Sequence, residues 1–391
     1  MSNSVNQNDF RFIDTADALL KFCNEIASAN ELAIDTEFIR EKSYYSQLCL
    51  IQIASHEHIA CIDPLAVADI GPLLDILYDS SKTKILHAAR QDLEIFFNLR
   101  EDIPKPIFDT QIAATVLGYG DQIGYSKLVE EFLDIHVEKG HARTDWSQRP
   151  LSKEQLNYAA NDVRYLIQIY PMIKQRLDEL GRSDWPDEDF QALCSPDLYR
   201  INSETIWQRI SGHQRLKGNK LAILQRLAAW REELAVTQNR PRKWILADDV
   251  MVALTQQAPS SVAQLKTLRG LAPRVLEKYG QDILDMIEQA KQLPKDQWPC
   301  KDKLQRPSSQ QEALTDGLMS LLKIRAAENS ITASALANRK DIEQLVMGEQ
   351  DLPLLHGWRA QLVGNDLVKM LKGELKLQVI SGKLTVLNSD D

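Results

Sequence analysis

The sequence lacks the long apolar runs and paired cysteines that mark membrane and secreted proteins. No stretch of the 391 residues approaches the roughly 18 apolar residues that span a bilayer, and the N-terminal MSNSVNQNDF is polar, unlike a signal segment. The five cysteines form no CxxC pair; they are Cys23, Cys49, Cys61, Cys194 and Cys300. We therefore expect a cytoplasmic protein without membrane contact, with Cys49 and Cys61 as buried thiols.

An excess of basic residues, which nucleic-acid-binding proteins often carry, is also missing. The chain has 46 lysines and arginines against 55 acidic residues, a formal net charge of −9. The negative charge lies in residues 1–202, which have 19 basic and 33 acidic residues. Residues 203–290 have 13 basic and 9 acidic residues. A basic middle segment can supply phosphate contacts, although many helical domains have as small an excess. The length and the 44% hydrophobic content allow two or three domains.

The chain does have acidic residues placed on apolar strands and helices. Asp35 and Glu37 follow a short apolar run in LAIDTEF, which predicts a buried strand. Residues two apart on a strand point to the same face, so both carboxylates project together from its C-terminal end. A hard cation such as Mg²⁺ or Mn²⁺ would relieve their mutual repulsion. The alternative is that Asp35 caps a turn and Glu37 is only solvated.

A third carboxylate, Asp92, lies in TKILHAARQDLEIFFNL, where a short strand is followed by a helix. The helix dipole stabilises a carboxylate in the first turn, so a helix-start role without any chemistry is the competing interpretation. His87 lies at the end of the strand and could approach the same site. Hard divalent metals prefer oxygen ligands, and a packed, hydrogen-bonded histidine is the alternative there.

A fourth carboxylate, Asp162, lies in a predicted long helix, LSKEQLNYAANDVRYLIQIYPMI. Ser152 and Gln155 have the spacing of a capping box, which starts a helix. Tyr158 precedes Asp162 by four residues and shares its helix face. Because a tyrosine has a pKa near 10, its hydroxyl should orient an attacking water better than it deprotonates it. An exposed Tyr–Asp pair is the alternative.

Together these side chains could hold two divalent ions about 3.5–4 Å apart. Such a pair lowers the pKa of water and stabilises a departing 3′ oxygen, which is the chemistry of phosphodiester hydrolysis by in-line attack. The sequence therefore predicts two Mg²⁺ or Mn²⁺ ions on four carboxylates, with Tyr158 as a further catalytic residue. The predicted metal ligands are Asp35, Glu37, Asp92 and Asp162.

The motifs DTEF, HAARQD and YAAND resemble, in this order, the three exonuclease motifs of the tyrosine-bearing branch of the DEDD superfamily. Residues 143–166, RTDWSQRPLSKEQLNYAANDVRYL, are similar to the third motif and its upstream flank in bacterial ribonuclease D, a family of 3′→5′ exoribonucleases of tRNA maturation. The resemblance implies that the four carboxylates bind metal and that Tyr158 positions the nucleophilic water. One departure is Ala88, where some superfamily members have Asn.

The resemblance implies an α/β fold for residues 1–180, a ribonuclease-H-like exonuclease domain with a mixed sheet flanked by helices. Strand-like LAIDTEF, LCLIQIA and HIACIDP follow one another through short turns, which favours antiparallel neighbours. Helices and strands then alternate up to IFDTQIAATVLG, where Asp109 is better interpreted as a helix N-cap than as a metal ligand. An acid- and proline-rich linker is predicted over residues 181–203.

Helices replace strands after about residue 180. Residues 204–290 contain NRPRKWILADDVMVAL and LKTLRGLAPRVLEKYG, which resemble the helicase-and-ribonuclease-D C-terminal (HRDC) domain, a small nucleic-acid-binding helical bundle. A second linker, 291–309, leads to residues 310–391, which are similar to the more divergent second copy in ribonuclease D. In the final LKLQVISGKLTVLN, apolar and polar residues alternate on both sides of Ser-Gly, which predicts a hairpin. We thus expect two small mainly α-helical domains after the exonuclease domain.

Two groups of residues are candidates for contact with RNA. The polar loop before the catalytic helix could grip a 3′ end by stacking and phosphate contacts, or be an ordered surface loop with a buried Trp. Basic positions of the HRDC-like domain could contact phosphates or be solvated helix ends. With His87, the candidates are Arg143, Trp146, Arg149, Arg240, Arg242, Lys243, Lys266 and Arg269.

The leading hypothesis is a metal-dependent 3′→5′ exoribonuclease that trims tRNA precursors, releases 5′-mononucleotides and works as a monomer. One alternative is a 3′→5′ DNA exonuclease, because proofreading domains share these motifs, although no polymerase or helicase block follows them. The other is an inactive tRNA-binding protein, which would have no need for four carboxylates and a tyrosine. Hydrolysis of matched RNA and DNA substrates discriminates between the three.

Overall fold

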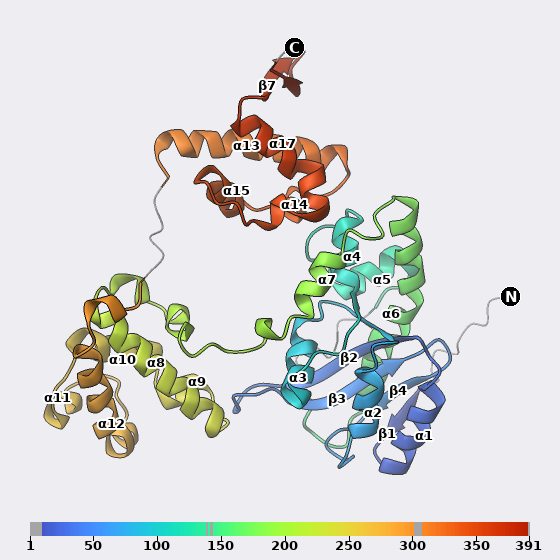
Figure 1. Ribbon diagram of the computed structural model, residues 1–391. Coiled ribbons are helices and arrows are strands. Elements are labelled where there is room, and N and C mark those ends of the chain that lie inside the picture. Colours follow the sequence, from blue (N-terminus) through green and yellow to red (C-terminus); the bar gives the residue numbers. More distant parts are fainter. Residues whose placement is uncertain (1–9, 138–139, 141–143, 301–306, 390–391) are drawn as a thin grey trace. The chain divides into compact units, whose positions relative to one another are not determined.

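The computed structural model describes residues 10–137, 140, 144–300 and 307–389 (Figure 1). These residues fall into two compact units. The first takes in the described chain up to Glu37, then Cys49–Ser195 and the described residues after 306. The second joins Phe38–Leu48 to the described part of 196–304.

A six-stranded sheet forms the centre of the first unit, with strand order β1-β4-β3-β2-β5-β6. β3 pairs antiparallel with β4, whereas β1 pairs parallel with β4, β2 with β5 and β5 with β6. The mixed sheet predicted from the sequence is therefore present. The strands are β1 (Arg11–Ile13), β2 (Glu31–Ile39), β3 (Gln47–Ala54), β4 (Ile59–Ile62), β5 (Thr83–Leu86) and β6 (Ile107–Asp109).

Helices cover both faces of this sheet (Figure 1). The connections through α1, α2 and α3 all step along the sheet in the same direction, and right-handed crossovers place such helices on one face. The long helix α6 packs against β4 and β5. The helices are α1 (Ala16–Ile26), α2 (Gly71–Leu77), α3 (Arg90–Arg100), α4 (Thr110–Val116), α5 (Tyr125–Leu133) and α6 (Lys153–Glu179).

The segment predicted as a first linker carries structure of its own. It contains α7 (Asp187–Leu193), and the ring of Trp185 stacks on that of Trp358 with centroids 4.9 Å apart. The Arg182 guanidinium donates to the carbonyl oxygens of Val116 and Asn329, each at 2.7 Å. Composition alone missed this because the partners lie up to about 170 residues away. The segment thus fastens the last part of the chain to the nuclease part.

That last part is mainly helical and ends in the predicted hairpin. β7 (Leu375–Ile380) and β8 (Lys383–Asn388) pair antiparallel through a turn at Ser381 and Gly382, whose φ angles are 48° and 76°. Positive φ at both positions gives the tight turn that suits the strand twist. The other elements are α13 (Ser309–Glu328), α14 (Ala333–Leu336), α15 (Arg339–Val346), η5 (Pro353–Leu355), α16 (Gly357–Arg359), the π-helix η6 (Ala360–Gly364) and α17 (Asn365–Leu371).

The second unit is a helical bundle around an apolar core. Trp207, Leu224, Met251 and Ile287 lie in that core, each at most 3% exposed. Its α-helices are α8 (Asn219–Thr237), α9 (Arg242–Ile245), α10 (Asp248–Gln257), α11 (Val262–Lys266) and α12 (Pro273–Lys291). Its 3-10 helices are η1 (Pro196–Leu198), η2 (Ile206–Arg209), η3 (His213–Arg215) and η4 (Lys295–Gln297).

Candidate active site

Three of the predicted metal ligands meet where β2 faces α6. Oxygen atoms of Asp35, Glu37 and Asp162 all lie within 4.8 Å of one another. β2 continues to Ile39, so the first two carboxylates lie inside the strand and not at its end as expected. The capping box at the start of α6 is present as predicted, and it fixes where the helix carrying Asp162 begins.

Asp92, the fourth carboxylate, lies in the first turn of α3 and is 8% exposed. The hydroxyl of Thr36 donates to Asp92 Oδ1 at 2.5 Å. This bond joins the first exonuclease motif directly to the second. Thr36 was not predicted as a site residue. It lies between two carboxylates on a strand, but its hydrogen-bond partner Asp92 lies 56 residues away in the sequence.

Burial raises the pKa of all four carboxylates, and the charges of neighbouring carboxylates raise the pKa of Asp35 and Glu37 further. Burial, followed by Asp162 and Asp92, raises the pKa of Glu37 to about 9. Burial raises the pKa of Asp162 to about 8 and that of Asp92 to about 6. The pKa of Asp35 is also raised, first by burial and then by the three neighbouring carboxylates. Such an oxygen-rich cluster fits a hard divalent cation, which would offset the repulsion.

Tyr158 lies half-buried on α6, four residues before Asp162. Burial, and then the charges of Asp162, Glu37 and Asp35, raise the pKa of its hydroxyl. Tyr158 therefore stays protonated near neutral pH and keeps a proton to donate. The ring of Trp146 lies 6.3 Å from its ring, centroid to centroid. The two rings are tilted by 32°, and this aromatic contact supports the side of α6 that carries the tyrosine.

Trp146 is buried, and the guanidinium of Arg149 is held by partners within the protein. Trp146 is 1% exposed, so its ring has no face to offer a base. Arg149 makes a two-pronged ion pair with Asp63, at 2.6 and 2.7 Å, and also donates to the carbonyl oxygens of Cys49 and Trp146. The alternative of an ordered loop with a buried Trp describes these two residues. Arg143 lies outside the described residues.

His87 and Asp109 organise the turn that leads into α3. The ring nitrogens of His87 lie 2.9 Å from Thr110 Oγ1 and 3.1 Å from the Ile123 carbonyl oxygen, and burial lowers the pKa of this histidine. Asp109 caps α4 as predicted and also accepts from the backbone N–H groups of Ala88 and Ala89. Ala88 has a φ of 56°, a conformation in which Asn is enriched, so a superfamily Asn suits this position.

Four of the five candidate RNA contacts of the second unit are exposed, and the fifth, Arg242, is half-buried. Arg240, Lys243, Lys266 and Arg269 are exposed. In contrast, Arg242 forms a double hydrogen-bonded ion pair with Glu232, at 2.5 and 2.6 Å, and lies over the ring of Tyr44 at 4.8 Å. Arg242 thus anchors the Phe38–Leu48 segment on α8 and α9. Trp244, which the sequence analysis missed, is 59% exposed beside Lys243.

The fold and the acidic cluster place the protein in the class of metal-dependent 3′–5′ exonucleases. A family model described as 3'-5' exonuclease matches residues 10–178, and one described as HRDC domain matches residues 220–287. Within the described ranges, no helix combines the length and apolar character needed to cross a membrane.

Curated relatives and a solved structure extend this likeness over more than nine-tenths of the chain. The chain is 39% identical to ribonuclease D of Sphingobium indicum, covering 95% of this chain and 97% of that protein. It is also 39% identical to ribonuclease D of Zymomonas mobilis, covering 94% and 95%. The crystal structure of Escherichia coli RNase D matches with a TM-score of 0.83 and 32% identity, covering 93% of this chain and 99% of that one. The chain therefore belongs to the ribonuclease D family, and it is a 3′→5′ exoribonuclease.

Proposed function

We propose that this exoribonuclease trims the 3′ ends of tRNA precursors and releases 5′-mononucleotides by two-metal hydrolysis. The observation that carries the proposal is the cluster of Asp35, Glu37 and Asp162 within 4.8 Å, with Asp92 joined to the same strand through Thr36. The similar E. coli protein is described as an exoribonuclease involved in structured RNA processing, which supports a folded RNA as the substrate.

The four carboxylates would hold two divalent ions, Mg²⁺ or Mn²⁺. When bound, the ions supply Lewis acidity that lowers the pKa of water and stabilises charge on the leaving oxygen. The carboxylates supply hard oxygen donors from one strand of the sheet, β2, and from two helices that cover it, α3 and α6. Their mutual repulsion, visible in the raised pKa of Glu37, favours loading with cations.

Tyr158 would orient the attacking water. Its hydroxyl remains protonated because its pKa is raised, so it acts as a hydrogen-bond donor and acceptor and does not serve as the base. Fixing the water in line with the scissile P–O bond lowers the entropic part of the barrier. The oxygen of water would bond to phosphorus as the bond from phosphorus to the 3′ oxygen breaks. A proton from the water would end on that 3′ oxygen, which becomes the 3′-hydroxyl of the shortened RNA, and the terminal nucleotide would leave with the 5′-phosphate.

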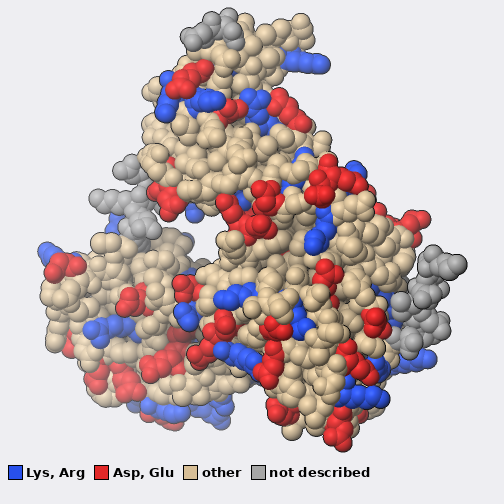
Figure 2. Space-filling model, turned by 45° about the vertical axis from the view of Figure 1, so that its right-hand side comes forward, with Lys and Arg blue, Asp and Glu red and all other residues tan. Residues whose placement is uncertain are grey.

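The helical parts would hold the RNA while residues 1–180 cut it. We assign this role to the domains at 204–290 and 310–391, with 181–203 and 291–309 as the connecting segments. Support comes from the HRDC match and from exposed basic side chains at Arg240, Lys243, Lys266 and Arg269. Lys and Arg are interspersed with Asp and Glu on the face drawn in Figure 2, so specific residues must supply the phosphate contacts there.

We further propose that the protein works as a monomer in the cytoplasm. All five cysteines are free, and three of them are buried, as suits a reducing compartment. One chain already supplies the carboxylate site, in the first unit, and candidate RNA contacts, in the second. Sedimentation of the purified protein across a tenfold range of concentration should give a single species with the mass of one chain, and a concentration-dependent dimer would contradict the monomer.

The test compares matched substrates. A tRNA with a short 3′ extension, an unstructured RNA and a DNA of the same sequence are incubated with Mg²⁺ or Mn²⁺. We expect metal-dependent loss of single 3′ nucleotides from the RNA, stopping near the mature tRNA end, with 5′-mononucleotide products. Asp35→Ala and Asp162→Ala should each lower turnover by more than about 10³-fold, judged against the scale of electrostatic catalysis, and remain folded.

The opposing results are distinct. Equal trimming of DNA would make the protein a general exonuclease. Binding of tRNA without hydrolysis by the wild-type protein would overturn the enzymatic proposal. Wild-type rates in either aspartate variant would contradict the metal assignment.

A further inference from the structure

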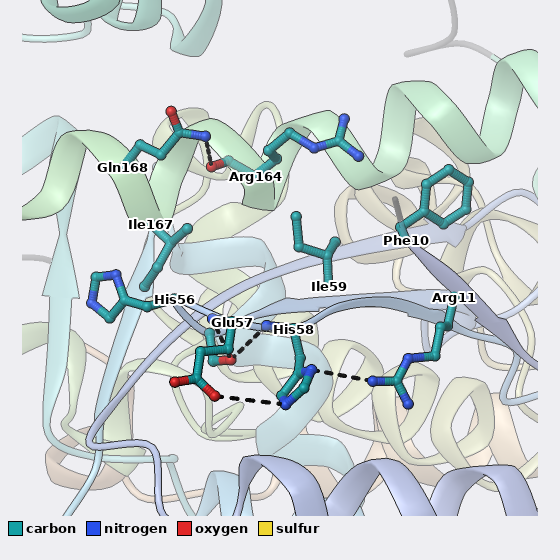
Figure 3. A pocket seen from close by; sticks show the side chains of 10 residues that line it. Phe10, Arg11, His56, Glu57, His58, Ile59, Arg164, Ile167 and Gln168 are labelled. Carbon is teal, nitrogen blue, oxygen red and sulfur yellow. Dashed lines mark hydrogen bonds and ion pairs between the residues drawn. The ribbon is translucent and has the colours of Figure 1, made fainter. Parts of the chain in front are cut away.

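A second pocket lies on the nuclease unit, and none of its lining residues belongs to the carboxylate cluster. Its volume is about 170 Å³. It is lined by Phe10 and Arg11, by the turn 55–58 between β3 and β4, by Ile59 of β4, and by α6. Figure 3 shows α6 on one side of it and the β3–β4 turn on the other.

Arg164 on α6 brings a buried positive charge to this pocket. The side chain is 3% exposed, and its Nη1 donates to the neutral amide oxygen of Asn161. Its Nε and Nη2 are buried and have no hydrogen-bond acceptor within the described residues. A guanidinium cannot shed its proton in a protein, and buried charges are normally paired or hydrogen-bonded. The Nε and Nη2 donors of Arg164 can therefore be satisfied by a ligand that brings oxygen acceptors, and an anionic ligand would also neutralise the charge.

The other basic side chains around the pocket, one arginine and two histidines, already have acidic side chains within 4.0 Å. Arg11 forms an ion pair with Glu25 at 2.5 Å and donates to His58 Nδ1 at 3.2 Å. His56 lies 3.0 Å from Glu31. Glu57, the acidic residue on the rim, is 86% exposed and approaches His58, as Figure 3 shows. Arg164 is thus the lining cation that lacks a carboxylate partner in the described part of the chain.

We infer that this pocket binds a phosphate group, with Arg164 as its main contact. The planar guanidinium presents N–H donors in a fork that matches two phosphate oxygens. The amide of Gln168 lies on the same helix one turn further, and Ile59 and Ile167 supply apolar walls. The volume equals that of roughly five or six liquid waters, which suits a phosphate and its immediate attachment. Either inorganic phosphate or the phosphate of a small mononucleotide could supply this group. The mononucleotide as ligand rests on the proposed function, which releases 5′-mononucleotides, whereas inorganic phosphate as ligand does not.

The experiment measures binding to the full-length protein in chelator by calorimetry, with inorganic phosphate and with 5′-AMP as separate probes. Without metal, the four carboxylates repel anions, so binding at the active site is suppressed. We expect saturable binding of one equivalent, weakened at least 10-fold by Arg164→Met, which keeps the aliphatic stem. Arg164→Lys should bind with intermediate affinity because it keeps the charge without the fork. Equal affinity for the two probes indicates free phosphate as the ligand; tighter 5′-AMP binding indicates a mononucleotide.

Two further variants make the result independent of folding defects at Arg164. Gln168→Trp fills the pocket from an exposed position and should also weaken binding at least 10-fold. Arg176→Met removes a cation of the same helix that is 58% exposed and pairs with Glu179; it should bind like the wild type. No saturable binding of either probe, or unchanged affinity in both Arg164→Met and Gln168→Trp, would overturn the inference.

The failure of this inference can be told apart from that of the proposed function. Trimming of tRNA precursors without phosphate binding in chelator contradicts only the second pocket. Loss of trimming in Arg164→Met with unchanged phosphate affinity also contradicts it, because Arg164 would then serve the carboxylates. Phosphate binding with no trimming by the wild-type protein contradicts only the proposed function.

Discussion

At the scale of single residues, Thr36 of the first motif adjusts the pKa of Asp92 in the second motif. Burial raises the pKa of Asp92 to about 6, whereas the hydrogen bond from Thr36 lowers it. Glu37 and Asp162 have higher pKa values, about 9 and 8. Asp92 is therefore the first of these three to become charged as the pH rises. A hydroxyl that donates to it holds an anionic ligand ready for a cation.

Thr36→Val should weaken metal binding without removing any ligand. A hydrogen bond to a charged group contributes about 1.5–3 kcal/mol, so its loss should raise the pKa of Asp92 and lower Mn²⁺ affinity about 10-fold. Calorimetric titration with Mn²⁺ at pH 7 measures this. Thr255→Val is the matched control, because Thr255 is also buried and its hydroxyl donates to a helix carbonyl in the second unit. Equal affinities in wild type and Thr36→Val would contradict this role.

Tyr158→Phe should separate catalysis from metal binding. We expect kcat to fall about 10²-fold, the lower range for a group that assists proton transfer or positions water, with Mn²⁺ affinity unchanged. Asp162→Asn should lose both. Tyr170→Phe, on the same helix but packed against Phe108, serves as the control. If Tyr158→Phe loses as much bound metal as Asp162→Asn, its water-orienting role is wrong.

At the scale of elements, the sequence predicts those helices and strands whose signals lie within the element itself. It does not predict those that depend on contacts with distant residues. α6 was predictable because its capping box and helical periodicity lie within the helix itself. The hairpin of β7 and β8 was predictable from alternation around Ser-Gly. β1 and β6, with three residues each, are too short for any period to show. Helix α7 within the expected linker 181–203 was not predictable, because the contacts of this segment, such as the Trp185–Trp358 stack, are tertiary.

The short helix α9 carries an exposed aromatic residue, Trp244, as a candidate RNA contact in addition to its basic residues. Trp244 is 59% exposed next to Lys243, and stacking of one base on an aromatic ring contributes about 1–3 kcal/mol. Trp244→Ala should therefore weaken RNA binding about 10-fold, measured by fluorescence anisotropy in an inactive Asp162→Asn background. Trp244→Phe should largely restore binding. Lys243→Met should instead reduce the salt slope by about one unit. Unchanged affinity in Trp244→Ala would remove Trp244 from the interface.

At the scale of the whole molecule, the two units respond to pH in opposite ways. In the first unit, burial raises the pKa of Glu37 above its ordinary value of about 4.3. In the second, hydrogen bonds from Arg242 and Tyr44 outweigh burial and lower the pKa of Glu232. Glu232 therefore stabilises its unit above pH about 4.3, and this stability is lost as the pH falls through its lowered pKa.

The first unit should instead lose folding stability as the pH rises when metal is removed. Between pH about 4.3, where an unfolded Glu ionises, and pH about 9, the pKa of folded Glu37, the folded state retains a proton that the unfolded state has lost. Stability is greatest below the unfolded pKa and falls with rising pH across this window, by up to about 1.4 kcal/mol per pH unit for one such group. Asp162 adds to the slope up to its own pKa of about 8.

Thermal unfolding of chelated protein between pH 5 and 9 measures this slope, and the first unit should melt at lower temperature as the pH rises. Saturating Mn²⁺ should remove or reverse the trend, because binding favours the ionised carboxylates. Glu37→Gln should flatten the chelated profile and raise stability at pH 8, although it abolishes turnover. Glu101→Gln, an exposed change on the same unit, should leave the profile as in the wild type. A chelated wild type that gains stability from pH 6 to 9 would show that repulsion within the carboxylate cluster does not govern this unit.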